Sequence, residues 1–237
     1  QLKSMAEKRD PKDAIRIYEE MLSGVDSAED RERLLIRLAN AYFRLNQFQE
    51  SIDAAQKLID LATTEESIAN ALFVQGNSYY KAGEYTASIA TSGKIIESYP
   101  QIAWARNAQF QIGVAYQKLS AGDIGVLPKM SEAFETYYTS YPDDDKAVHA
   151  YYYDAWARYR LGRWREASDT FNALSAKYPT ERYAPEALFR AGEALFNLTN
   201  RGNRDEKDSV LDECMAIYDR VASKFPGSDY VDDALYN

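Results

Sequence analysis

Apolar residues along the chain recur at i, i+3, i+4 and i+7, the spacing of amphipathic helices. These stretches come in pairs separated by a short turn. Gly83 and Gly162 stand at matching turns, where a glycine favours a left-handed helix end. Each second helix ends at an aromatic-proline pair, because proline cannot continue a helix and biases the residue before it away from helix. The pattern therefore predicts an all-α fold of antiparallel helix pairs.

The helix pairs form a repeat with a basic period of 37 residues. An aromatic-proline linker, followed at fixed offsets by a large residue, a small one and an alanine, recurs at Tyr99-Pro100, Tyr141-Pro142, Tyr178-Pro179 and Phe225-Pro226. A small residue within the first helix recurs at Ala39, Gly76, Gly113, Ala155 and Gly192, at intervals of 37, 37, 42 and 37 residues. Such self-similarity is the signature of a stacked helical solenoid.

Two insertions account for the longer repeats, and both fall between the two helices of a pair. Residues 121–129 carry apolar side chains that we expect to be exposed and available for contact. Residues 199–208 are polar, which is typical of a helix extension or a turn. The small residues Gly76, Gly113, Gly192 and Ala167 are predicted to mark the close crossing of paired helices, and Cys214 is predicted to be buried and inert at such a crossing.

Taken together, these residues resemble the tetratricopeptide repeat (TPR): a Gly or Ala in the first helix, a Tyr one turn later, a turn Gly before an aromatic, and a closing Pro. The resemblance covers nearly the whole chain, and its departures include Ser51, Ser88, Met130 and Cys214 where the motif prefers Ala. It implies an all-α, right-handed TPR superhelix, a single solenoid over residues 1–237. Its expected units are a partial repeat at 1–26, repeats at about 32–63, 69–100, 106–142, 148–179 and 185–226, and a partial repeat at 232–237.

The linker also resembles a subgroup of bacterial cell-envelope proteins, the Tol-Pal-associated cell-division coordinators and the TPR lipoprotein of the outer-membrane barrel-assembly machinery. This resemblance implies a periplasmic or outer-membrane-associated scaffold that binds other proteins. The alternatives are a cytoplasmic TPR adaptor or chaperone, and the regulatory TPR segment of a protein with an enzyme domain elsewhere. Because the chain starts and stops inside first helices without polar caps, we expect a piece of a longer solenoid, with any lipid anchor outside it.

In TPR arrays the first helix of each pair lines the concave surface, so the resemblance also implies a binding face. Aromatic rings there supply buried area, while amide and basic groups suit a partner's extended peptide or helix. Lysine is absent one turn before the inward Asn, where Ile36 and Phe73 stand instead, so chaperone-tail binding is not expected. The predicted partner-binding residues are Asn40, Phe43, Arg44, Phe73, Asn77, Tyr80, Lys81, Phe110, Gln117, Lys118, Tyr152, Trp156, Tyr159, Arg160, Phe189 and Phe196.

Composition excludes several other classes of function. The net charge of −9 and the pI near 4.8 disfavour nucleic acid. The longest apolar runs are far shorter than a bilayer span requires. His149 and Cys214 are the only histidine and cysteine, and phosphate-binding glycine loops are missing, so we predict no enzyme, no metal site and no cofactor. We interpret His149 as a groove side chain and Asp143 to Asp145 as a solvated helix cap.

Overall fold

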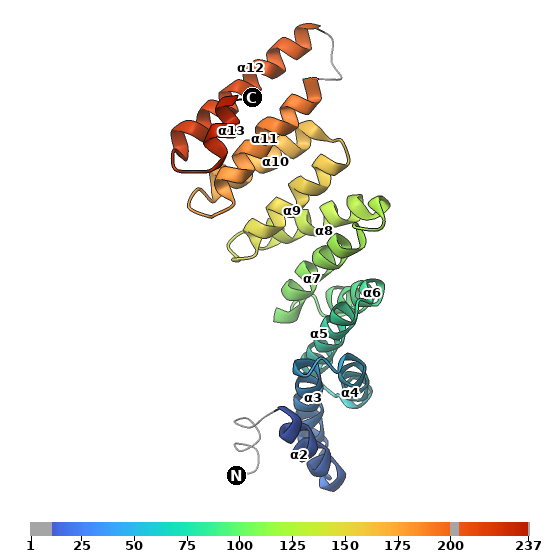
Figure 1. Cartoon of the computed structure of the whole chain (residues 1–237). Helices are drawn as coiled ribbons and strands as arrows, with labels where there is room; N and C mark the ends of the chain where they lie inside the picture. The colour runs from blue at the N-terminus through green and yellow to red at the C-terminus, as the bar shows by residue number, and fades with distance from the viewer. Residues whose placement is uncertain (1–10, 200–203, 237) are drawn as a thin grey trace. The chain divides into compact units, whose positions relative to one another are not determined.

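The computed structural model describes residues 11–199 and 204–236, in which helices are joined by turns and loops and no strand occurs (Figure 1). The predicted all-α architecture of helix pairs is therefore confirmed. The helices are α2 (Pro11–Gly24), α3 (Ala28–Arg44), α4 (Phe48–Leu61), α5 (Glu65–Ala82), α6 (Tyr85–Ser98), α7 (Ala103–Leu119), α8 (Leu127–Ser140), α9 (Ala147–Arg160), α10 (Trp164–Lys177), α11 (Ala184–Thr199), α12 (Arg204–Lys224) and α13 (Tyr230–Tyr236).

The helices form two compact units, residues 1–118 (unit 1) and residues 119–237 (unit 2). The boundary falls at the end of α7, inside the predicted repeat at 106–142. Within each unit the helices that follow one another in sequence pack as neighbours, for example α3 with α4 and α10 with α11. A single continuous solenoid across both units stays a prediction.

The turns inside the helix pairs adopt the left-handed conformation that the glycine pattern predicts. Gly83 has φ 87° and Gly162 has φ 71°. The Gly83 N–H donates to the Tyr80 carbonyl at 3.1 Å, which closes the last turn of α5. The equivalent residue of the first complete pair is Asn46, with φ 59°. Asparagine is one of the few residues other than glycine that enter this region readily, so the turn geometry is kept without a glycine.

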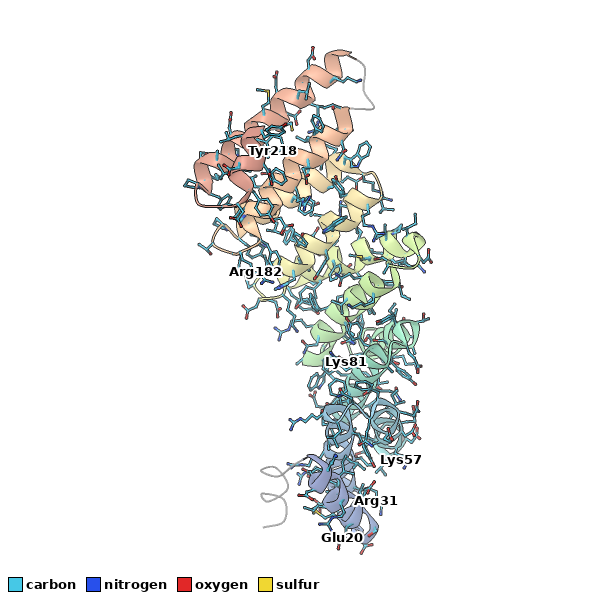
Figure 2. The ribbon with its side chains drawn as sticks, in the orientation of Figure 1. Glu20, Arg31, Lys57, Lys81, Arg182 and Tyr218 are labelled. Atoms are coloured by element: carbon cyan, nitrogen blue, oxygen red, sulfur yellow. The ribbon has the colours of Figure 1, made fainter. Side chains whose placement is uncertain are left out.

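The small residues of the first helices lie at close helix crossings, as predicted. Ala39 and Ala155 are fully buried. A Cβ added to Gly76 would lie 3.3 Å from the Ser92 hydroxyl on α6, and a Cβ added to Gly192 would lie 2.5 Å from the ring of Tyr218 on α12 (Tyr218 is marked in Figure 2). An added methyl group therefore has less room at Gly192 than at Gly76.

Two of the departures from the repeat motif form hydrogen bonds at these crossings. Ser51 on α4 donates its hydroxyl to the Ala39 carbonyl at 2.8 Å, and the Cys214 thiol on α12 donates to the Gly192 carbonyl at 3.2 Å. Burial raises the pKa of the Cys214 thiol, which is only 2% exposed. The predicted burial of Cys214 is confirmed. At both positions a polar side chain stands where the motif prefers alanine, and it donates to a backbone carbonyl of the paired helix.

The two insertions extend the ends of helices. Residues 121–129 form a turn, a short 3₁₀ segment at Ile124–Val126 and the first turn of α8. Asp123 caps the segment by accepting from the Gly125 N–H at 2.8 Å, and Ile124 is 68% exposed, as the sequence predicts. In the second insertion, Thr199 ends α11 and α12 begins at Arg204, so residues 204–208 are a helix extension. Residues 200–203 lie outside the described residues.

Candidate functional site

The predicted binding residues lie on the first helix of each pair, and we call this set the first-helix face. In unit 1 it comprises α3, α5 and α7, and in unit 2 it comprises α9 and α11. A basic residue ends the first helix in four repeats, and its side chain is exposed in each: Arg44, Lys81, Lys118 and Arg160 (Lys81 is marked in Figure 2). A cation there stabilises the negative end of the helix dipole and also presents positive charge to a partner.

The aromatic residues of the face in unit 1 are partly used within their own repeats. Phe43 lies edge-on to Phe48, with ring centroids 5.8 Å apart, and Tyr80 lies edge-on to Tyr85 at 5.5 Å. Both Phe43 and Tyr80 are half-buried. Each therefore braces the turn of its helix pair with one ring edge and leaves the rest of the ring accessible.

The other predicted residues of the face in unit 1 differ in how far they are exposed. The exposed Asn40 donates its amide to the Ile36 carbonyl one turn earlier, at 2.7 Å. Asn77, Phe110 and Gln117 are half-buried. Asn40 is thus oriented along its own helix, with its amide oxygen left to accept from a partner.

In unit 2, two predicted residues on α9 form hydrogen bonds with side chains of α11. Tyr152 donates its hydroxyl to Glu186 at 2.8 Å, and Asn197 donates its amide to the Tyr159 hydroxyl at 2.8 Å. Burial, and then the hydrogen bond to Glu186, raise the pKa of Tyr152 above its usual value. Trp156 is half-buried and lies edge-on to Tyr159 at 5.7 Å. The first helices of unit 2 are therefore joined by a hydrogen-bonded seam.

One predicted binding residue on α11, Phe189, does not lie on the surface. Phe189 is only 5% exposed, because its ring packs against Tyr218 and Tyr230 in the core of unit 2. It therefore serves packing and does not present its ring to a partner. Phe196, two turns further on, is 48% exposed and remains available on the surface. Repeat position alone did not reveal this, because the burial of Phe189 depends on α12 and α13.

A recurring aromatic stack joins the face to the start of the next repeat, and the sequence pattern contained both of its members without showing that they meet. Phe73 stacks on Trp104 at 4.8 Å with an interplanar angle of 28°. At the equivalent positions in unit 2, Tyr152 lies against Tyr183 at 5.2 Å and 37°, and Phe189 lies against Tyr230 at 5.5 Å and 30°. The aromatic residue that follows three of the four linkers, Trp104, Tyr183 or Tyr230, thus covers the aromatic of the preceding first helix.

Sequence reasoning also missed a buried charged cluster in unit 2. Asp154 is fully buried on α9, and its carboxylate accepts from the hydroxyls of Ser131 and Tyr138 and from Arg158 Nε, the last two at 2.8 Å. Arg158 also donates to Glu135 at 2.8 Å. A buried carboxylate needs such partners, so the cluster fixes how α8 packs on α9.

The described residues carry no cluster of three or more groups that could hold a metal ion. None of the described helices is long and apolar enough to cross a membrane. His149 is half-buried with its ring edge-on to Tyr183 at 5.2 Å, which places it among packed aromatics. Asp144 accepts from the Tyr137 hydroxyl at 2.6 Å and from the Lys146 N–H at 2.9 Å, so the predicted capping role of the aspartate run holds for this residue.

Comparison with protein families decides what kind of repeat this is. Two family models, both described as tetratricopeptide repeat, match residues 36–101 and residues 149–180 and 186–228. The chain belongs to the tetratricopeptide repeat family. Proteins of this family act as scaffolds that bind other proteins, and the fold is generally non-catalytic. A comparison with curated protein sequences finds no match.

Solved structures support the same fold at low sequence identity. The TPR protein YrrB, whose structure is described as having an unusual peptide-binding site, is 15% identical over 93% of this chain and 98% of its own, with a TM-score of 0.60. A tetratricopeptide repeat protein from Parabacteroides merdae is 14% identical over 99% of this chain and 94% of its own, with a TM-score of 0.61. The structure of MamA AMB-1 is 12% identical over 88% and 99%, with a TM-score of 0.57.

Proposed function

We propose that the chain is a non-catalytic scaffold whose first-helix face binds an extended peptide or a helix of a partner protein. The observation that carries this is a half-exposed ring beside an exposed basic group at equivalent places in three repeats: Phe43 with Arg44, Tyr80 with Lys81, and Tyr159 with Arg160. Such a pair suits a partner that offers an apolar side chain next to a carboxylate. The peptide-binding site of YrrB, a protein of the same fold, supports this assignment.

The likeness of its linkers to those of bacterial envelope proteins supports a place in the periplasm or at the outer membrane. A cytoplasmic adaptor is the alternative. Fractionation of cells that express the complete natural protein separates the two. Recovery with the periplasmic or outer-membrane fraction supports the envelope assignment, and recovery with the cytoplasm contradicts it.

The binding face is tested by affinity capture with the 237-residue chain immobilised, followed by identification of the retained proteins. We expect Tyr80→Ala in unit 1 or Trp156→Ala in unit 2 to reduce recovery of a specific partner, because a buried aromatic contact contributes roughly 2 kcal/mol or more. Circular dichroism of each variant verifies that the helices remain folded.

The matched controls remove exposed groups from second helices. Lys57→Ala on α4 removes an exposed basic group, and Met215→Ala on α12 removes an exposed apolar one (Lys57 is marked in Figure 2). The controls should leave recovery unchanged. Equal recovery of every partner by wild type, Tyr80→Ala and Trp156→Ala would contradict the proposal.

A further inference from the structure

The ring that follows a linker in the recurring aromatic stack is missing at two places: Lys146 stands there after Tyr141-Pro142, and the other place lies between α3 and α5 in unit 1. Ile36 lies one repeat of 37 residues before Phe73, and Ser67 lies the same distance before Trp104. At this α3–α5 junction the ring that covers the first helix at three other junctions is replaced by a serine hydroxymethyl group. The two first helices are nevertheless direct neighbours, as α3 packs on α5.

A hollow of about 510 Å³ opens at this position. Ile36 and Leu58 contribute apolar surface to its lining, while Ser67 and Asn70 contribute polar groups from α5. No aromatic side chain lines it. Its volume falls within the ~300–1,000 Å³ range of clefts that hold small molecules or partner side chains. We call it the Ile36–Ser67 hollow.

The charges around the Ile36–Ser67 hollow favour a cationic neighbour. Glu29 and Glu32 both line it, against one guanidinium, that of Arg33. Arg33 pairs with Glu29 and lies 3.7 Å from Asp30, so its charge is already shared. Glu32 accepts from the Thr63 N–H at 3.2 Å and from the Thr63 hydroxyl at 3.4 Å, which holds its carboxylate beside the opening. The lining keeps a net negative charge.

We propose that the Ile36–Ser67 hollow receives an aromatic side chain of a partner segment, with a basic residue next to that side chain. The ring of the partner takes the place that Trp104, Tyr183 and Tyr230 fill in three other junctions, and the basic group pairs with Glu32. This inference rests on the proposed function, because it names the chemistry of a partner that binds the first helices.

The test uses the whole chain with labelled isoleucine and leucine methyl groups, followed by NMR. The probe is the tripeptide acetyl-Lys-Trp-Lys-amide, compared with acetyl-Glu-Trp-Glu-amide and acetyl-Lys-Ala-Lys-amide. We expect a saturable shift of the Ile36 methyl signal with the first peptide, about fivefold weaker binding of the Glu peptide at low salt, and no saturation with the Ala peptide. A failure of the Lys-Trp-Lys peptide to shift Ile36 overturns the proposal.

Substitutions at one position fill or preserve the hollow. Ser67→Trp supplies the ring that three other junctions carry, so peptide binding at Ile36 should fall at least tenfold, whereas Ser67→Ala should keep it. Glu32→Lys gives a second readout that needs no change in packing, because it should reverse the preference between the Lys and Glu peptides. Undiminished binding in Ser67→Trp, or an unchanged preference in Glu32→Lys, contradicts the assignment.

The outcomes separate this inference from the proposed function. If Tyr80→Ala and Trp156→Ala reduce partner capture while Ile36 does not respond to peptide, the scaffold role stands and the hollow does not. If Ile36 responds while capture is unaffected, the hollow binds aromatics but the wider face does not bind partners. A shift of Ile36 that depends on protein concentration without peptide would assign the hollow to a second copy of this chain and overturn the partner assignment.

Discussion

The junction between α9 and α11 in unit 2 and the junction between α3 and α5 in unit 1 occupy equivalent places in the repeat, yet they differ in how they are filled. In unit 2, the Tyr152 ring packs at a tilt against Tyr183 and its hydroxyl donates to Glu186, so the seam is packed and hydrogen-bonded. In unit 1, Ile36 faces the short side chain of Ser67 across an open hollow. Side-chain size at one linker position therefore decides whether a junction is packed or open to a partner.

The contrast between α9 and α5 extends to the residue that precedes the small crossing residue on each helix. In unit 2 this is Asp154, fully buried and bound to three groups. In unit 1 it is Gln75, buried but bound through its amide to Gln56 at 3.0 Å, near the surface. A buried charge with several partners holds its helices more strictly than a single neutral hydrogen bond.

The largest expected effect comes from Asp154→Ala. It leaves the guanidinium of Arg158, which is 14% exposed, without its buried partner, so we expect a loss of roughly 3–5 kcal/mol in the free energy of unfolding. Gln75→Ala in unit 1 should cost about 1 kcal/mol. Urea denaturation monitored by circular dichroism measures both. Equal losses would remove the distinction between the two units at this position.

Trp104→Ser gives the packed α5–α7 junction the serine that the open α3–α5 junction carries at the equivalent position. Loss of the ring that stacks on Phe73 should lower the free energy of unfolding by roughly 3 kcal/mol. The matched control is Ser67→Ala, where the equivalent position already lacks a ring and stability should stay within about 0.5 kcal/mol. If Trp104→Ser also proves neutral in urea denaturation, the stack does not stabilise the junction.

The helix crossings of the two units should respond differently to an added methyl group. Gly192→Ala places its Cβ against the buried Tyr218 ring, and we expect a loss of about 2 kcal/mol. Gly76→Ala meets only the Ser92 hydroxyl at 3.3 Å, and the better helix propensity of alanine offsets that contact. Comparing the thermal midpoints of the two variants checks this. A larger drop for Gly76→Ala would mean that an added methyl group has less room at Gly76 than at Gly192.

The smallest effect concerns alkaline pH. Burial, followed by the hydrogen bond to Glu19, raises the pKa of Tyr42 to about 12 in the folded chain. Below pH 10 both folded and unfolded chains hold the proton, so the contribution to stability is fully present. Between pH 10 and 12 the unfolded chain loses it first, and stability falls.

Tyr42→Phe provides the control for that alkaline loss. Because it removes the phenol, stability measured by urea denaturation should decline less steeply between pH 10 and 12 than in the wild type. Spectrophotometric titration should also show one fewer tyrosine that ionises only at high pH. Identical pH profiles would mean that the Glu19 contact does not hold the Tyr42 proton.

Local rules in the sequence determined the helices, their pairing and their turns. Apolar periodicity selects helices, proline ends them, and Gly83 and Gly162 are placed where the backbone needs positive φ. The small residues at the crossings and the burial of Cys214 followed from the period alone, since helices approach closely only where side chains are small. The 37-residue repeat therefore sufficed to predict the architecture and the family.

Only the tertiary structure decided which repeated residues are used within the chain and which face solvent. Phe189 and Phe196 lie two turns apart on the same helix, yet α12 and α13 cover the first and leave the second exposed. The buried cluster of Asp154 and the Ile36–Ser67 hollow likewise depend on residues 16 to 31 positions away in sequence. A repeat pattern fixes where side chains stand, but burial is set by the volume of whatever packs opposite them.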